Sequence, residues 1–269
     1  MSRLAQTFAR IRAEKRPGLV TFTTAGDPDL PRSAEILKAL DRAGADVLEV
    51  GVPFSDPLAD GPVIQRATER AIAAGGSLRA SIAMIAKVRP QIAAPIVVFS
   101  YANPILRLGL DAFARQAADA GVDGVLALDL PIEEAGGFRA ALASAGIDTI
   151  FLLSPTTTEA RIQQAAELGS GFLYGISRLG VTGARAEVAS GAEAMVRRIR
   201  AHTAMPIALG FGISRPEHVA EVCAYADAAV VGSALVSVIA EASAAPDLVA
   251  RVEHYVRWLR GAAARHVHA

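Results

Sequence analysis

Cysteine, lysine, histidine and aromatic residues are scarce in this chain of 269 residues, and each shortage excludes a class of protein. The lone cysteine, Cys223, rules out an internal disulfide framework, so we expect a cytoplasmic protein. Lys+Arg and Asp+Glu both number 27, so no net charge attracts nucleic acid or an anionic membrane surface. Apolar stretches such as residues 228–240 are interrupted by glycine or serine and fall short of the roughly 20 residues that a membrane helix needs. We therefore expect a small-molecule substrate and neither a nucleic-acid nor a membrane partner.

The few basic side chains also narrow the chemistry. None of them ends an apolar run of the kind that forms a strand: the lysines are Lys15, Lys38 and Lys87, and the histidines are His202, His218, His254, His266 and His268. A Schiff-base lysine and a histidine-bound catalytic metal are both disfavoured. The substrate must then accept electrons itself when a proton moves, as an electron-rich ring can.

A repeated joint organises the chain. Ala-Gly-Xaa-Asp occurs at residues 43–46, 120–123 and 145–148, each time between a helical pattern and an apolar run. Glycine adopts the left-handed conformation that ends a helix, after which the chain enters a strand. The repeat predicts alternating helices and strands.

Eight apolar runs are spaced as strands: residues 19–23, 47–50, 96–100, 124–128, 149–153, 172–176, 207–209 and 228–231. Alternation with helices implies a parallel sheet, and eight units imply closure into an α/β fold of the (β/α)8 TIM-barrel type. An open, doubly wound sheet is the alternative. No linker is evident, so we expect one barrel domain over residues 1–269.

The two ends carry their own signals. Leu4, Phe8 and Ile11 recur at helical spacing, which predicts an extra N-terminal helix in residues 1–15 that covers the barrel floor. The alternative is an organellar transit peptide, because acids are scarce there. Residues 262–269 are expected to form a loose tail.

Acidic residues cluster after the second strand. Alternation along that strand turns Val47 and Glu49 into the barrel, where an apolar setting raises the pKa of a carboxyl group and suits it to proton transfer near neutral pH. Asp60 lies in the following loop and is either functional or the N-cap of the next helix. Asp56 can simply shape a turn, and Asp129, at the end of the fourth strand, is either a substrate ligand or a solvated acid at the rim.

Glycine-rich turns end the seventh and eighth strands, at residues 210–214 and 232–234. Barrels of this class often bind phosphate between these two loops and a helix N-terminus. Ser214, with Pro216 and Glu217, is typical of a capping box that opens a helix. A third loop, residues 177–184, has glycines able to act as hinges of a closing lid.

Taken together, residues 49–65, Gly180-Val181-Thr182-Gly183 and residues 210–214 resemble the tryptophan synthase alpha chain family, with strand order and loop positions matching from about Thr21 to Ser233. The resemblance implies cleavage of indole-3-glycerol phosphate to indole and glyceraldehyde 3-phosphate, with the protonated indole ring as electron sink.

The same resemblance implies roles for individual residues. Glu49 would exchange protons between the glycerol hydroxyl and the ring, and Asp60 would stabilise the charge at the indole nitrogen. Thr182 in the lid would position Asp60. The remaining substrate pocket would consist of Phe22, Tyr101, Asp129 and Tyr174, and the phosphate site of Gly183, Gly212, Gly232 and Ser233.

The family works with a beta chain that carries pyridoxal phosphate, in an alpha2beta2 heterotetramer. The resemblance therefore implies no cofactor in this chain and an interface that includes Pro53, Asp56, Asn103 and Pro104. Three alternatives stay open at this point: a stand-alone lyase of the same chemistry, a weakly active barrel that acts as an allosteric binding subunit, and a phosphate-binding isomerase.

Overall fold

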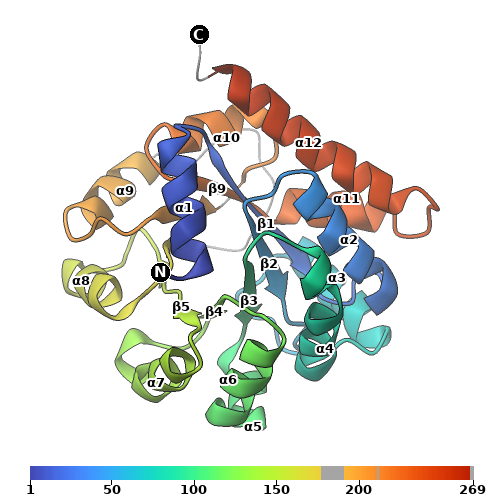
Figure 1. Ribbon diagram of the computed structural model, residues 1–269, viewed down its shortest axis with the longest axis horizontal. Helices are drawn as coiled ribbons and strands as arrows, with labels where there is room; N and C mark the ends of the chain where they lie inside the picture. Colours follow the sequence, from blue (N-terminus) through green and yellow to red (C-terminus); the bar gives the residue numbers. More distant parts are fainter. Residues whose placement is uncertain (177–190, 211, 267–269) are drawn as a thin grey trace.

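A computed structural model describes residues 1–176, 191–210 and 212–266, with side chains followed as far as residue 261. Its strands run parallel in the order β5-β4-β3-β2-β1-β9-β8-β7-β6, with helices around them (Figure 1). The strands are β1 (Gly18–Thr24), β2 (Val47–Gly51), β3 (Ile96–Ser100), β4 (Gly124–Ala127), β5 (Asp148–Thr149), β6 (Leu152–Leu153), β7 (Leu173–Ile176), β8 (Ile207–Gly210) and β9 (Ala228–Val231).

The helices follow the strands in alternation, as the sequence predicts. They are α1 (Arg3–Ala13), α2 (Leu30–Arg42), α3 (Pro62–Ala73), α4 (Leu78–Val88), α5 (Ala102–Leu108), α6 (Leu110–Asp119), α7 (Gly136–Ser144), α8 (Glu159–Leu168), α9 (Ala192–Arg200), α10 (Pro216–Cys223), α11 (Ser233–Glu241) and α12 (Leu248–His266). Two short 3-10 turns, Arg89–Gln91 and Ile132–Glu134, complete the regular structure of the described residues. Helix α12 continues further than expected for a loose tail that begins at residue 262.

The fifth predicted strand is split into β5 and β6, and this split closes the ring. Thr149 of β5 pairs with β4, whereas Leu152 of β6 pairs with β7. Between them, the Ile150 amide donates to Val125 on one side, and the Phe151 carbonyl accepts from Tyr174 on the other. One short segment therefore bridges both neighbours. The closed eightfold barrel is confirmed, and the open-sheet alternative is wrong.

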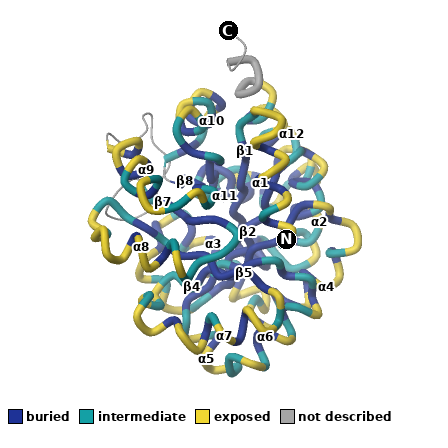
Figure 2. The backbone as a smooth tube through the Cα atoms, turned by 60° about the vertical axis from the view of Figure 1, so that its left-hand side comes forward, coloured by how far each residue is buried: buried dark blue, intermediate teal, exposed yellow. Residues whose placement is uncertain are grey.

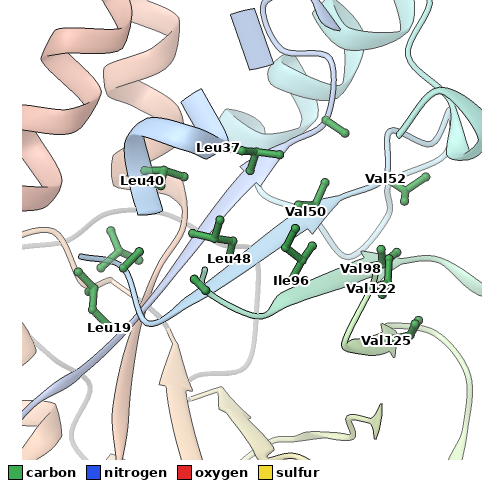
Figure 3. Close-up of a cluster of buried hydrophobic side chains, with 14 of the residues drawn as sticks. Leu19, Leu37, Leu40, Leu48, Val50, Val52, Ile96, Val98, Val122 and Val125 are labelled. Atoms are coloured by element: carbon green, nitrogen blue, oxygen red, sulfur yellow. The ribbon is translucent and has the colours of Figure 1, made fainter. Parts of the chain in front are cut away.

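Two apolar cores lie on the two faces of the strands. Leu48 and Val50 point outward and pack under Leu37 and Leu40 of α2 (Figure 3). Val47, from the same strand, joins the inner core. The tube coloured by burial shows the same layering, with buried strands inside and exposed residues on the outer sides of the helices (Figure 2). The predicted alternation along β2 is confirmed.

Helix α1 covers one end of the barrel. Ser2 caps it by accepting from the Ala5 amide, and Leu4, Phe8 and Ile11 are buried on one face. The Phe8 ring packs against Phe172 of the inner core with centroids 5.4 Å apart. Figure 1 shows α1 inside the circle of helices, as predicted for a helix that covers the barrel floor.

The acidic residue of the repeated joint fastens adjacent strands together. Gly44 and Gly121 have positive φ, as expected where a helix ends. The carboxylate of Asp46 accepts the Leu19 amide of β1 at 2.9 Å. Asp123 in turn accepts the Ile96 amide of β3 at 2.8 Å.

A third acid, outside the repeat, makes the same bond: Asp227 accepts the Ile207 amide of β8 at 2.8 Å. Asp148, from the third copy of the repeat, does not, and its Oδ2 has no hydrogen-bond partner among the described residues. Asp46, Asp123 and Asp227 thus each satisfy an amide at the start of the preceding strand, at the barrel floor.

Asp46 also binds two arginines from distant parts of the chain. Arg16 donates at 2.8 and 3.0 Å, and Arg260 of α12 donates at 2.8 Å. The Asp46 side chain is buried, while both guanidinium groups keep about a quarter of their side-chain surface exposed. This cluster joins the residues after α1, the start of β2 and the C-terminal helix.

No single helix in the described part of the chain is long and apolar enough to cross a membrane. Two helical segments, Pro62–Ala73 and Leu78–Gln91, reach that length and apolar character only when they are taken together, and they are bent by 86° at the break between them.

We expect Asp46→Ala to lower the free energy of unfolding by about 2–4 kcal/mol, because it removes an ionic hydrogen-bonded cluster and leaves a buried amide unsatisfied. Urea unfolding of the two chains measures the difference. Asp119→Ala, which changes an exposed acid at the end of α6, is the control and should alter stability by less than about 0.5 kcal/mol. Equal stability of Asp46→Ala and the parent chain would show that the cluster is not needed.

Candidate functional site

Glu49 occupies the interior of the barrel. It lies on β2 between Phe22 of β1 and Val97 of β3 in the strand register. Its side chain is completely buried, and neither carboxylate oxygen has a hydrogen-bond partner among the described residues. Burial raises the pKa of Glu49 to about 8, so the group holds its proton at neutral pH. The inward orientation predicted from sequence is confirmed.

Aromatic side chains surround this carboxyl group. Phe99 of β3 lies edge-on to Phe22, with ring centroids 5.5 Å apart, and also edge-on to Tyr174 of β7 at 6.4 Å. Burial raises the pKa of the Tyr174 hydroxyl, and the nearby Glu49 charge raises it further. Two of the residues expected in the substrate pocket, Phe22 and Tyr174, therefore lie beside Glu49. Phe99 was not foreseen, although an aromatic residue near the end of a strand is a usable signal.

A narrow hollow of about 10 Å³ lies beside the Phe22 and Phe99 rings, at the carboxyl ends of the strands. Gly51, the last residue of β2, lies directly against the Phe22 ring, since a Cβ atom at this position would be 2.5 Å from a ring atom. The hollow is lined by Phe22, Thr24, Gly51, Val52, Asp60, Ile64, Thr68, Phe99 and Tyr101. These side chains are mostly apolar or aromatic, and one of them is a carboxylate.

Asp60 supplies that carboxylate. It does not cap α3, because Gly61 occupies the N-cap position without a side-chain hydrogen bond. Instead the Tyr101 hydroxyl donates to Asp60 Oδ2 at 3.1 Å and accepts from the Ala59 amide at 3.0 Å. Burial raises the pKa of Asp60 to about 6, and the Tyr101 hydrogen bond opposes that rise. The N-cap alternative is wrong, and Asp60 and Tyr101 meet as one unit.

Asp129 has a different position from the other expected pocket residues. It is exposed, and its Oδ1 accepts the Ala102 amide at 2.6 Å. It therefore satisfies the first amide of α5, next to Tyr101. A substrate contact for Asp129 stays a prediction.

The loops after β8 and β9 have the geometry of an anion site. Gly212 has a φ of 74°, which favours glycine. Gly232 occupies the N-cap of α11, and Ser233 begins the helix. The first amides of α11, which have no partner within the helix, therefore face the loop at the carboxyl end of β9. Helix α10 begins after the Gly212 turn, as the sequence predicts. Ser214 does not cap it, because Arg215 is the N-cap, and the Arg215 side chain makes no cap bond. Thr182, Gly183 and the rest of the expected lid, residues 177–184, lie outside the described residues.

The residues expected to face a partner surround the same rim. Asp56 and Asn103 are exposed, Pro104 is half-buried, and Pro53 is buried in the isolated chain. Sequence reasoning missed two exposed apolar side chains beside them: Leu58, 90% exposed, and Leu106, 56% exposed. Leu58 could have been found as a large apolar residue between Asp56 and Asp60 in the loop after the second strand. Large exposed apolar side chains are typical of an interaction surface.

No cluster of three or more histidine, cysteine or acidic residues able to hold a metal occurs in the described residues. The site contains two carboxyl groups with different pKa values, Glu49 inside the barrel and Asp60 towards its rim. Such a pair can hold a proton at one position and a negative charge at another at the same pH.

Comparisons with known proteins agree with this geometry. The model of the tryptophan synthase alpha chain family matches residues 8–264. The tryptophan synthase alpha chain of Geobacter sulfurreducens is 48% identical over 262 residues, which cover 97% of this chain and 99% of the relative. That of Geotalea uraniireducens is 49% identical over 241 residues, 90% of each chain.

Solved structures give the same result. A chain of Mycobacterium tuberculosis tryptophan synthase superposes with a TM-score of 0.90 at 37% identity, over 98% of both chains. The tryptophan synthase alpha subunit of Legionella pneumophila has a TM-score of 0.88 at 35% identity, also over 98% of both chains.

The buried proton of Glu49 makes stability depend on pH. The folded chain keeps that proton up to about pH 8, whereas an unfolded glutamate releases it near 4.5. The contribution of Glu49 to folding is therefore complete below pH 4.5 and is lost as the pH rises towards 8.

We expect Glu49→Gln to gain stability relative to the parent chain between pH 5 and pH 9. The gain is at most about 5 kcal/mol, because one pKa unit corresponds to about 1.4 kcal/mol. Urea unfolding at several pH values measures it, with the exposed Glu69→Gln on α3 as control. A stability difference that does not change with pH would mean that Glu49 titrates normally.

Proposed function

The chain belongs to the tryptophan synthase alpha chain family, and on this premise we propose that it cleaves indole-3-glycerol phosphate to indole and glyceraldehyde 3-phosphate. Family membership makes it a subunit of a lyase-type enzyme. The specific reaction is supported by one observation above all: a fully buried, protonated Glu49 is paired in the strand register with Phe22, whose side chain lines the same hollow as Asp60.

The cleavage needs one proton to move from the side-chain hydroxyl to C3 of the indole ring. In our proposal Glu49 donates its proton to C3, which converts the ring into a cation. Glu49, now ionised, accepts the hydroxyl proton as the C3–carbon bond breaks. The electron pair of that bond returns to the ring, the hydroxyl becomes the aldehyde of glyceraldehyde 3-phosphate, and Glu49 is protonated again. No lysine or metal is required, because the ring is the electron sink.

Asp60 has the complementary task. With a pKa of about 6 it is mostly ionised at neutral pH, at the opening of the same hollow. A carboxylate near the ring nitrogen stabilises the positive charge that arises when C3 is protonated, and it does so most strongly where water is excluded. Tyr101 orients this carboxylate. Thr182, which we also propose to position Asp60, lies outside the described residues.

The phosphate group would bind beside the hollow, where Gly232 lies close to Phe22: a Cβ atom at Gly232 would be 3.7 Å from Phe22 Cβ. We assign it to the backbone at Gly183, Gly212 and Gly232 and to Ser233 at the start of α11. The positive φ of Gly212 and the position of Gly232 before a nine-residue helix support this assignment. Phe22, Tyr174 and Asp129 complete the proposed substrate pocket.

We further propose that indole passes to a beta chain that carries pyridoxal phosphate, within an alpha2beta2 heterotetramer. The exposed Leu58 and Leu106, next to Asp56 and Asn103, support a partner at this rim over a stand-alone lyase. The buried, protonated Glu49 argues against a barrel that acts chiefly as a binding subunit. The cytoplasmic location stays a prediction.

Purified chain incubated with indole-3-glycerol phosphate should release indole slowly, and faster when a tryptophan synthase beta chain is added. Glu49→Gln should lower kcat by about 10²–10⁴-fold, the usual contribution of a general acid-base group. Glu69→Gln on α3 should retain full turnover. Absence of indole release in every condition would contradict the proposed reaction, and full turnover without a beta chain would favour the stand-alone lyase.

The pH dependence of kcat/KM tests the two carboxyl groups separately. Activity needs Asp60 ionised and Glu49 protonated, so it should rise near pH 6 and fall near pH 8. Tyr101→Phe removes the hydrogen bond that lowers the pKa of Asp60, so the acidic limb should move to higher pH. The alkaline limb should not move. A Tyr101→Phe profile identical to that of the parent chain would contradict the role of Tyr101.

A further inference from the structure

The loop after β8 is fixed by side chains from two helices that lie behind it. The Ser214 amide donates to Nδ1 of His218, on α10, at 3.3 Å. The Tyr255 hydroxyl, on α12, donates to the Ser214 carbonyl at 2.9 Å. Both bonds end on the backbone of Ser214, which is two residues from Gly212. Neither bond depends on the serine hydroxyl.

The two supporting side chains are themselves held in place. His218 is only 3% exposed, and Ile213, beside Ser214 in the loop, is buried in the outer core. The Tyr255 ring stacks on Trp258 with centroids 5.7 Å apart. Helices α10 and α12 pack against each other at the edge of the barrel (Figure 1). Each side chain therefore presents its polar atom to Ser214 in a fixed direction.

These bonds have no evident use in starting the helix. The N-cap of α10 is Arg215, whose own side chain makes no cap bond. The bonds instead fix the peptide groups on both sides of Ser214, at the end of the Gly212 turn. A loop that binds an anion through its amides binds best when those amides are ordered beforehand, because ordering them on binding costs conformational entropy.

We propose that Tyr255 and His218 are positioning residues that preorganise the 212–214 loop for the phosphate group of the substrate. This inference rests on the proposed function, since it requires that the loop bind phosphate. It adds that affinity for the phosphorylated end of the substrate is controlled from the C-terminal helix, outside the hollow that takes the ring.

Tyr255→Phe is the direct test, because it removes the hydroxyl and keeps the ring on Trp258. We expect KM for indole-3-glycerol phosphate and the dissociation constant of inorganic phosphate to rise about 3- to 10-fold, the effect of losing one hydrogen bond. kcat at saturation should change less than twofold. KM for the dephosphorylated indole glycerol should not change, because that compound does not use the loop.

His218 provides a second pair of variants. Asn offers an acceptor near the position of Nδ1, and Leu does not, so His218→Asn should keep more phosphate affinity than His218→Leu. Tyr225→Phe, which removes a hydroxyl from another half-buried tyrosine, is the control and should bind like the parent chain. Thermal unfolding of each variant separates a loss of affinity from a loss of folding.

The outcomes distinguish a failure of the positioning role from a failure of the proposed function. If the parent chain cleaves the substrate and binds phosphate but Tyr255→Phe and His218→Leu do so equally well, the positioning role is wrong and the proposed function stands. An equal rise in KM for the phosphorylated and dephosphorylated compounds also contradicts the positioning role. If the parent chain neither cleaves the substrate nor binds phosphate, the proposed function fails and this inference fails with it.

Discussion

The burial of one carboxyl group without a hydrogen-bond partner among the described residues is the constraint on which this structure depends. An ionised carboxylate inside an apolar barrel is costly, so Glu49 keeps its proton up to about pH 8. The side chain of Glu49 is confined to this interior because alternate side chains of a strand in a closed barrel point inward. Under the proposed function the unfavourable position is also the useful one, because a carboxylic acid that is neutral at physiological pH can donate a proton.

Stability and chemistry are separated between the two ends of the barrel. At the floor, Asp46, Asp123 and Asp227 each bind an amide at the start of the preceding strand, and α1 covers this end with apolar side chains. At the opposite end, glycines and loops replace those bonds, around the buried polar groups of Glu49, Asp60 and Tyr101. These bonds fix the starts of β1, β3 and β8 without using any residue of the site, so the stability that they contribute offsets the cost of burying Glu49.

Sequence was sufficient for the strands, the closed ring and the inward direction of Glu49, because all three follow from local periodicity and a repeated joint. It was not sufficient where distant residues compete for the same polar group. The sequence around Asp60 fits a helix N-cap as well as a site residue, and only the approach of Tyr101 from β3 decides between them. Ser214 likewise has the pattern of a cap, yet its backbone is bound by His218 and Tyr255. The split of the fifth strand depends on pairing with two neighbours at once, which no local pattern encodes.

Tyr101 connects the two surface segments that we expect to face the beta chain. Its hydroxyl binds Ala59 and Asp60 at the end of one segment, and its own backbone forms the N-cap of α5, where Asn103 and Pro104 lie. Asp129 holds the first amide of α5 from the neighbouring strand end. A partner that contacts both segments therefore acts on the orientation of the Asp60 carboxylate through a single side chain. Under the proposed function, docking and charge stabilisation are coupled by this geometry, and no large movement of the barrel is needed to couple them.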